Sequence, residues 1–179
     1  TAIMVGVGKA ASNGILIKDA ESLELAKQIN AIILDKTGTI TEGKPLVTNI
    51  NWLNDDDTQK TILFSIEKQS EHPLAEAIIN YLQIPEVLQL NLFESITGKG
   101  AKAEFHDVKY FVGSKKLLQE NNILIDEKLS TDSISWEQES KTVIWFSDDK
   151  QALAVIAIAD KIKPTSIQAI HQLQKSGIE

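Results

Sequence analysis

The 179-residue sequence has no cysteine, and it has only three histidines. Without cysteine the chain can form neither a disulfide framework nor a thiolate metal site, and it has no cysteine nucleophile. The histidines, His72, His106 and His171, are too far apart in the sequence to indicate a zinc site. Basic residues are also scarce: 18 Lys and Arg stand against 25 Asp and Glu, for a formal charge of −7. This balance argues against nucleic acid as a main partner, because binding to its phosphates needs a basic face.

Long apolar runs are absent as well. The longest, residues 152–159, has eight residues, whereas a membrane span needs roughly 18. The N-terminus lacks the charged lead and the apolar stretch of a signal peptide. The 42% hydrophobic and 24% charged residues are those of an ordinary soluble domain. We therefore expect a soluble protein from a reducing compartment.

Both ends of the sequence look cut. The sequence begins without Met, and it stops at Gly177-Ile178-Glu179, just after a predicted helix. A helix followed by Gly and an apolar residue usually precedes another strand. We therefore interpret the sequence as a piece of a longer protein whose next strand is missing.

The first and last parts of the sequence have the pattern of an α/β fold. Residues 31–34 form an unbroken apolar run that ends in Asp35, and residues 153–159 form a similar run that ends in Asp160. Continuous apolar strands are typical of parallel sheets covered on both faces. An acidic residue at the carboxyl end of such a strand lies where these sheets bind ligands. The other elements expected here are a strand at 14–17, a helix at 21–28 and a helix from Pro164 to the residues before Gly177.

The middle of the sequence has a different pattern. Asp57 or Thr58 can cap a helix through residues 62–66, and a second helix begins at Pro73. We interpret this part as an α+β domain, built on an antiparallel sheet flanked by helices, that is inserted into the α/β frame. Period-two alternation predicts its two hairpins, 101–105 with 108–112 and 141–146 with 151–158. The expected division is an N-terminal α/β part at 1–43, the inserted domain at 44–149 and a C-terminal α/β part at 150–179.

The strongest motif is Asp35-Lys-Thr-Gly-Thr-Ile-Thr41, which follows an apolar run. A carboxylate there can act as a covalent nucleophile toward a phosphoryl group. The transferred group then needs hydrogen-bond donors and positive charge around its oxygens, and Lys36, Thr37 and Thr39 can supply some of them. Gly38 lets the backbone come close. For an isolated Asp-x-Thr-Gly, a strand followed by an Asx-type turn is the simpler alternative.

The whole seven-residue string resembles the phosphorylation motif of P-type ATPases, which belong to the haloacid-dehalogenase-like phosphotransferases. The resemblance implies an incomplete, Rossmann-like phosphorylation domain formed by 1–43 and 150–179. It also implies that Asp35 accepts the γ-phosphoryl group of ATP with Mg²⁺ bound. Asp35 and the Thr37 carbonyl would ligate Mg²⁺. The phosphate-binding candidates are Lys36, Thr37 and Thr39.

A second motif, Ser70-Glu-His-Pro-Leu74, precedes the second middle helix. The positive partial charge at a helix N-terminus favours a neutral imidazole, whose ring is free to stack on or hydrogen-bond a base. The simpler alternative is a capping Ser or Glu beside an exposed histidine. Ser-Glu-His-Pro resembles the nucleotide-domain signature of heavy-metal-transporting P-type ATPases. This resemblance implies that His72 orients the adenine and that Glu67 makes a second adenine contact.

The third motif, Thr97-Gly-Lys-Gly-Ala101, satisfies with Ala103 the pattern Gly-x-Gly-x-x-Ala of dinucleotide-binding folds. That fingerprint needs a helix after it. The alternation that follows here predicts a strand, so we reject the dinucleotide fingerprint. Gly98 and Gly100 instead leave the backbone open to a flat ring or to phosphates, and a plain turn is the alternative. Heavy-metal ATPases carry Gly-x-Gly at this place, so the resemblance makes both glycines nucleotide-binding candidates.

Three further segments extend the resemblance. Gly113 and Ser114, at a strand end, are similar to the family's Gly-Asn or Gly-Ser pair, and they become nucleotide-binding candidates. Residues 159–164 are similar to the segment that returns to the phosphorylation domain, where Asp160 is a structural or hinge candidate. The opening residues 1–23 resemble copper- and silver-type pumps more than zinc- or potassium-type ones.

The resemblance as a whole implies the cytoplasmic ATP-binding portion of a membrane pump that exports a heavy-metal ion, Cu(I) or Ag(I), through an aspartyl-phosphate at Asp35. Its partners would be ATP and the rest of the pump, whose membrane, actuator and metal-binding domains are not in this sequence. We expect the fragment to bind nucleotide without turning it over, because further Mg²⁺ ligands are missing. Alternatives are a stand-alone, non-catalytic nucleotide-binding module and a zinc- or cadmium-type pump. A soluble phosphatase of the same superfamily is disfavoured, since Thr37 stands where those enzymes carry an acidic general acid.

Overall fold

The computed structural model describes residues 2–179, which form two compact units. We call residues 41–161 the central unit, and residues 2–40 with 162–179 the terminal unit. From the sequence we expected the inserted domain at 44–149. The limits differ because strand β6, Ala152–Ile162, lies in the sheet of the central unit and extends this unit to residue 161.

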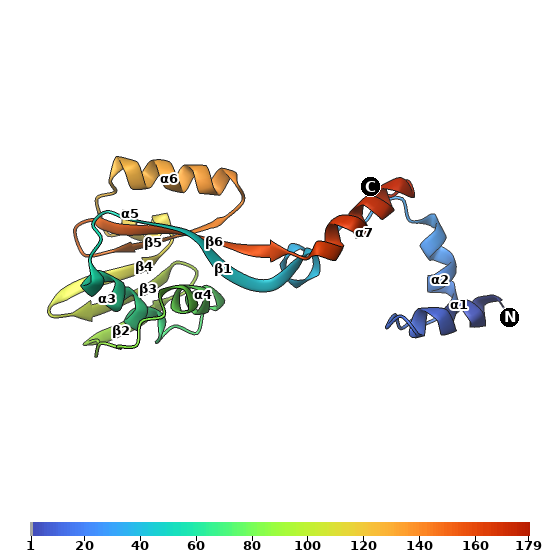
Figure 1. The fold of residues 1–179 in the computed structure, drawn as a ribbon, viewed down its shortest axis with the longest axis horizontal. Coiled ribbons are helices and arrows are strands. Elements are labelled where there is room, and N and C mark those ends of the chain that lie inside the picture. Colours follow the sequence, from blue (N-terminus) through green and yellow to red (C-terminus); the bar gives the residue numbers. More distant parts are fainter. Residues whose placement is uncertain (1) are drawn as a thin grey trace. The chain divides into compact units, whose positions relative to one another are not determined.

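A six-stranded antiparallel sheet forms the middle of the central unit, with the strand order β1-β6-β5-β4-β3-β2 (Figure 1). The first predicted hairpin is confirmed, because β3 and β4 are antiparallel with Ala101 opposite Val112. The second is confirmed by β5 and β6, in which Ile144 lies opposite Ile156. The strands are β1 Thr41–Trp52, β2 Leu92–Ile96, β3 Gly100–Phe105, β4 Val108–Gly113, β5 Thr142–Ser147 and β6 Ala152–Ile162.

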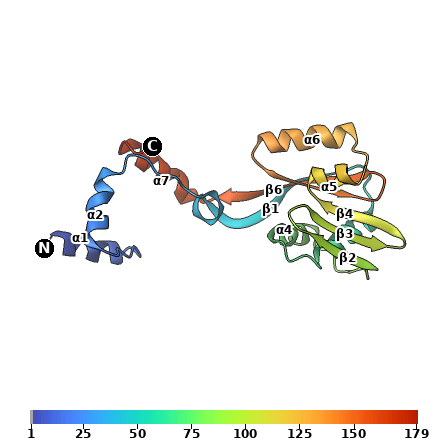
Figure 2. The same ribbon diagram turned by 180° about the vertical axis from the view of Figure 1, so that it is seen from behind.

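Helices cover both faces of this sheet (Figures 1 and 2). Helices α3, Asp57–Glu67, and α4, Pro73–Leu82, pack on one face, and both were predicted. Helices α5, Lys115–Glu120, and α6, Glu127–Gln138, pack on the opposite face and were not predicted. The expected antiparallel sheet flanked by helices is therefore confirmed, with one more pair of helices than the sequence indicated.

Each face of the sheet has its own hydrophobic core. The core under α3 and α4 is built from buried residues that include Ile62, Leu63, Ile66, Ile78, Val112, Ile144 and Phe146. The core under α5 and α6 includes Phe111, Leu117, Leu118, Leu129, Trp136, Trp145 and Val155. Because the sheet is covered on both sides here, β5 and β6 are buried over most of their length and have no continuous polar face.

This double burial corrects one expectation. We predicted the apolar run at 153–159 as a strand of a parallel sheet in the phosphorylation domain. It is instead part of β6, antiparallel to β5 and inside the central sheet. Residues 152–158 are all buried, and an antiparallel strand covered on both faces has the same unbroken apolar pattern as a parallel one.

The residues that cap helices α3 and α4 differ from those that the sequence suggested. The side chain that caps α3 is Asp56, which accepts the Thr58 N–H at 2.7 Å, rather than Asp57 or Thr58. Helix α4 is capped by His72, and Pro73 is its first residue, as expected. An acceptor placed one residue before the helix satisfies a backbone N–H that has no partner inside the helix.

The terminal unit contains the helices α1, Ala2–Ala11, α2, Ala20–Leu25, and α7, Pro164–Lys175, with a 3₁₀ turn at Ala26–Gln28. The predicted helices at 21–28 and from Pro164 are confirmed. None of the helices in the described part of the chain has both the length and the apolar character needed to cross a membrane.

The two strands predicted for this unit are wrong. Residues 15–19 and 29–35 form neither helix nor strand, and Ile33 is fully exposed. The second segment does have the bonds of a parallel pair: the Ile32 N–H donates to the Glu179 carbonyl at 2.7 Å, and the Glu179 N–H donates to the Asn30 carbonyl at 2.8 Å. A strand needs hydrogen-bonded neighbours along its length. Among the described residues, the segment 29–35 has such a pairing only with Glu179.

Candidate functional site

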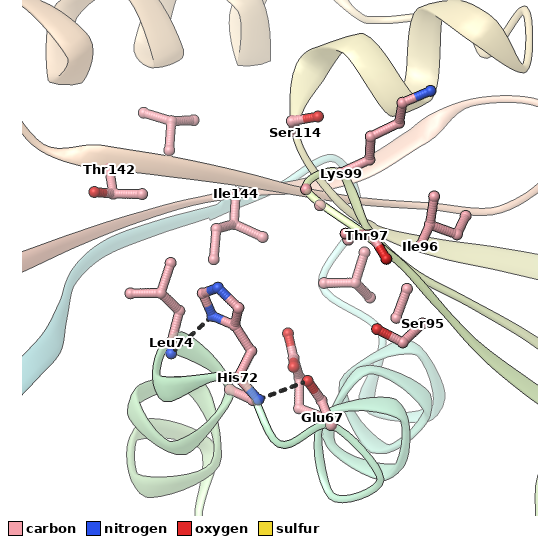
Figure 3. A pocket seen from close by; sticks show the side chains of 18 residues that line it. Glu67, His72, Leu74, Ser95, Ile96, Thr97, Lys99, Ser114, Thr142 and Ile144 are labelled. Atoms are coloured by element: carbon pink, nitrogen blue, oxygen red, sulfur yellow. Dashed lines mark hydrogen bonds between the residues drawn. The ribbon is translucent and has the colours of Figure 1, made fainter.

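The central unit contains a pocket of about 300 Å³, lined by residues from α3, α4, the strands β2 to β5 and the β2–β3 turn (Figure 3). All six nucleotide-binding candidates from the sequence line it: Glu67, His72, Gly98, Gly100, Gly113 and Ser114. These residues come from four separate stretches of the chain, and the fold brings them together.

His72 lies at the N-terminus of α4 and is part of its cap. Its Nδ1 atom accepts the Leu74 N–H at 3.2 Å. Its own backbone N–H donates to the Ser70 hydroxyl at 3.3 Å. The simpler alternative from the sequence was a capping Ser or Glu beside an exposed histidine; the histidine is exposed, but the side chain that caps the helix is His72 itself. The histidine therefore both caps the helix and lines the pocket.

Glu67 is the last residue of α3 and its side chain reaches into the same pocket (Figure 3). The residue is only 5% exposed. This burial raises the pKa of the Glu67 carboxyl to about 7, because a charged carboxylate is poorly solvated there. Near neutral pH the group can therefore accept a hydrogen bond as a carboxylate or donate one as an acid.

Gly100 and Gly113 lie opposite each other in the antiparallel pair of β3 and β4. A Cβ atom on Gly100 would lie 2.0 Å from the Val112 carbonyl oxygen, and one on Gly113 would lie 2.1 Å from the Lys99 carbonyl oxygen. The Ser114 N–H donates to that same Lys99 carbonyl at 2.8 Å. The backbone contact itself therefore requires these two glycines, whether or not a ligand is bound.

The sequence missed several residues that line the pocket. Leu74, Val112 and Ile144 give it apolar side chains, and Ser95 and Thr97 give it hydroxyl groups. Ser95 lies opposite Ala101 in the β2–β3 pair. Its position beside the Gly-x-Gly turn is the signal that could have found it, because residues paired with a turn's flanking strand face the same space.

Residues 35–40 of the Asp35–Thr41 motif lie in the terminal unit, and Asp35 is exposed. In the loop 36–40, Gly38 has φ of +76°, a conformation that favours glycine. The start of α7 fixes this loop: the Lys163 ammonium donates to the Gly38 carbonyl at 2.6 Å, and the Ser166 hydroxyl donates to the Ile40 carbonyl at 2.8 Å. The loop thus holds Asp35 together with the exposed Lys36, Thr37 and Thr39.

The loop 36–40 offers few oxygen ligands for a magnesium ion. Within residues 2–179, no group of three or more His, Cys, Asp or Glu side chains is arranged to bind a metal. Mg²⁺ commonly uses one or two carboxylates, several waters and the phosphates of a nucleotide. The Asp35 carboxylate and the Thr37 carbonyl are compatible with that mode.

Asp160 connects the two ends of the chain that leave the central unit. Its carboxylate accepts the Thr41 hydroxyl at 2.5 Å and the backbone N–H groups of Gly43 and Lys44, each at 3.0 Å. The Thr41 hydrogen bond holds the pKa of Asp160 below its usual value. These bonds fasten the beginning of β1 to the end of β6, which fits the structural role considered for Asp160.

Comparison with known proteins identifies the family. The family model of haloacid dehalogenase-like hydrolases matches residues 29–179. The chain therefore belongs to the haloacid dehalogenase-like hydrolases.

Curated relatives give a more specific similarity than the family model does. The chain is 42% identical over 187 residues to a protein described as "Probable copper-transporting ATPase PacS" from Synechocystis, a match that covers 99% of this chain and 25% of the relative. It is 41% identical over 181 residues to a "Copper-exporting P-type ATPase" from Staphylococcus epidermidis, covering 100% of this chain and 22% of the relative. The chain thus spans about a quarter of the length of these relatives.

Solved structures agree on the fold. A zinc-transporting PIB-type ATPase in its E2.Pi state matches with a TM-score of 0.76 and 25% identity, over 99% of this chain and 29% of that chain. The N-domain of HMA6, a copper-transporting P-type ATPase, matches with a TM-score of 0.53 and 18% identity, over 65% of this chain and 99% of that domain. At that identity the second match supports the fold alone.

Proposed function

We propose that the chain is the catalytic ATP-binding portion of a heavy-metal-transporting P-type ATPase. In this proposal the central unit is the nucleotide-binding domain, and the terminal unit is part of the phosphorylation domain. The observation that carries the proposal is the pocket: six residues selected by their resemblance to one family's nucleotide motifs line a single cavity. The relatives named as copper-transporting ATPases, at 41–42% identity, support it.

The pocket offers a nucleotide both apolar and polar contacts. Leu74, Val112 and Ile144 can pack against the flat faces of a purine. Glu67 and His72 can form hydrogen bonds with the edge of the base. The exposed backbone at Gly98 and Gly100 and the Ser114 hydroxyl can contact the ribose or the phosphates.

Asp35 is the proposed phosphoryl acceptor. One oxygen of its carboxylate forms a bond to the γ-phosphorus of ATP while the bond from that phosphorus to the bridging oxygen breaks, and ADP leaves. Lys36, Thr37 and Thr39 can donate hydrogen bonds to the transferred group. A magnesium ion bound by Asp35 and the Thr37 carbonyl would neutralise charge on the phosphates.

The remaining parts of the proposal concern the whole protein. We infer an ATP-driven pump that exports Cu(I) or Ag(I), with this portion on the cytoplasmic side of the membrane and the membrane, actuator and metal-binding domains as its partners. The relatives named as copper-transporting and copper-exporting ATPases, at 41–42% identity, support copper as the transported metal.

The proposed role of Asp35 as phosphoryl acceptor can be tested in the full-length pump, by measuring the acid-stable phosphoenzyme that forms from γ-labelled ATP. Asp35→Asn should abolish the labelled phosphoenzyme, because the amide cannot act as the nucleophile. Asp107→Asn, the same chemical change in the β3–β4 turn, is the matched control and should keep wild-type labelling. Labelling that survives in the Asp35→Asn pump would place the acceptor at another residue.

A further inference from the structure

The positive charge that lines the pocket is paired with an acidic side chain of the same unit. Among the residues that the structure describes, Lys99 is the one lysine or arginine that lines the pocket, and it lies in the β2–β3 turn. Its ammonium donates to the Glu120 carboxylate at 2.6 Å. In Figure 3 the Lys99 side chain extends from the turn toward the helix that follows Ser114, and away from His72.

The backbone of Lys99 is held beside the start of α5. Its N–H donates to the Ile96 carbonyl at 3.0 Å, and its carbonyl accepts the Ser114 N–H at 2.8 Å. Ser114 is the N-cap of α5, and Glu120 is the last residue of this six-residue helix. The contact between the turn and the start of α5 therefore brings the Lys99 side chain within reach of Glu120.

The position of Glu120 in its helix is unfavourable for an acid. The partial negative charge at a helix C-terminus disfavours a carboxylate there. The hydrogen bond from Lys99 compensates, and it holds the pKa of Glu120 below its usual value. The side chains of Lys99 and Glu120 are 35% and 42% exposed. Because an ion pair this exposed contributes little to stability, a bound anion can compete with Glu120 for the ammonium.

We propose that Glu120 is a specificity-determining residue that, by pairing with Lys99, limits the preference of the pocket for nucleoside triphosphates over monophosphates. The inference rests on the proposed nucleotide-binding function. Gly98, Gly100 and Ser114, which we assign to the ribose or the phosphates, are next to Lys99 in the chain or bonded to it. An unpaired ammonium there would attract a triphosphate more than a monophosphate, because the triphosphate carries more negative charge. The pair with Glu120 is neutral and removes most of this difference.

Calorimetric titration of the 179-residue chain with ATP and with AMP measures the preference. Glu120→Gln removes the charge and keeps the size of the side chain. We expect this variant to bind ATP about fivefold more tightly than wild type does, and AMP less than about twofold more tightly. Its ATP affinity should also fall more steeply with NaCl, because a charged contact to the phosphates has formed. A ratio of ATP to AMP affinity equal to that of wild type would overturn the proposal.

A second lysine–glutamate pair supplies the matched control. Lys102 Nζ lies 2.8 Å from Glu94 Oε2, across the β2–β3 pair, and neither residue is among the described residues that line the pocket. Glu94→Gln makes the same change in net charge and should leave both affinities within about twofold of wild type. If it raises ATP affinity as much as Glu120→Gln does, net charge alone explains the effect and the proposal is overturned.

A double-mutant cycle tests whether Glu120 acts through Lys99. We expect Lys99→Met to weaken ATP binding at least threefold more in the Glu120→Gln chain than in wild type, because only there is the ammonium available to the phosphates. Equal losses in the two backgrounds would overturn the role of Glu120 and leave the proposed function standing. Absence of ATP binding in wild type and in every variant would instead overturn the proposed function, and this inference with it.

Discussion

At the scale of single residues, the polar groups of the pocket also have structural roles. His72 caps α4 while lining the pocket, and Gly100 permits a backbone contact between two strands. Glu67, the last residue of α3, is buried, with only 5% of its surface exposed. Burial of a carboxyl costs stability, which is consistent with the ligand-binding role that we propose for Glu67.

The raised pKa of Glu67 predicts a pH-dependent stability. The pKa is about 7 in the folded chain and 4.5 without burial, so the folded state holds this proton more tightly than the unfolded state does. The contribution is fully present below pH 4.5 and is lost as the pH rises toward 7. We expect the free energy of unfolding of wild type, relative to Glu67→Gln, to fall by on the order of 3 kcal/mol over that window.

Urea unfolding followed by tryptophan fluorescence measures this difference at pH 5 and pH 8. Glu67→Gln serves as the non-titrating reference for wild type, since its amide has nearly the same shape as the carboxyl group and does not titrate. Parallel pH profiles for the two proteins would contradict the burial-induced shift.

At the scale of elements, the contact between β3 and β4 makes a sharp prediction. Gly100→Ala should destabilise the chain by roughly 2 to 4 kcal/mol, because its Cβ would lie 2.0 Å from the Val112 carbonyl oxygen. Gly98→Ala is the matched control: its φ of +71° carries strain, but its Cβ would meet nothing within 4 Å. We expect it to cost about 1 kcal/mol. Equal losses in urea unfolding would show that the close approach is unimportant.

The hydrogen bonds from the start of β1 to Asp160 near the end of β6 lead to another prediction. Thr41→Val removes the hydroxyl that donates to Asp160 at 2.5 Å, so the pKa of Asp160 should rise toward its usual value. Thr41→Ser keeps the hydroxyl and should keep the low pKa. Because the folded-state pKa of Asp160 is lowered, its hydrogen bonds stabilise the chain above the unfolded-state pKa, and this contribution is lost as the pH falls through the folded-state pKa. Carboxyl ¹³C titration measures the pKa, and an unchanged value in Thr41→Val would contradict the assignment.

The elements that the sequence predicted are those with a clear local signal. The hairpins around residues 106–107 and 148–150 alternate with period two, and α4 begins at a proline. Helix α6 was missed because only Leu129, Ser133 and Trp136 of its twelve residues are buried, which leaves a weak apolar stripe.

The failed strands have a different cause. The apolar run at 31–34 has a strand's composition, but strands form only with neighbours, which composition does not reveal.

The candidate site likewise contains residues that the sequence could predict and residues that only the fold reveals. Short motifs pointed to Glu67 and His72, whereas Ser95 and Thr97 enter the pocket only through the pairing of β2 with β3.

At the scale of the whole molecule, charge limits how the chain can bind a nucleotide. The chain has a net charge of −7. Lys99 is the one lysine or arginine among the lining residues in the described part of the chain, and its ammonium pairs with Glu120 at 2.6 Å. The base should therefore contribute more to binding than the phosphates do.

A salt and ligand series tests this expectation. We expect AMP to bind within roughly tenfold of ATP, and ATP affinity to change less than about threefold as NaCl is raised to about 0.3 M. Calorimetric titration measures both quantities. A steep loss of affinity with salt would indicate that charged phosphate contacts dominate instead.

The most direct test of the central claim is an ATP titration of the ¹⁵N-labelled chain followed by amide chemical shifts. The account predicts that the largest shifts fall on the pocket, at Glu67, His72, Gly98, Gly100 and Ser114. The amides of α6, on the opposite face of the sheet, should remain unchanged. Shifts that are absent at the pocket, or that gather on α6, would contradict the claim that this pocket binds the nucleotide.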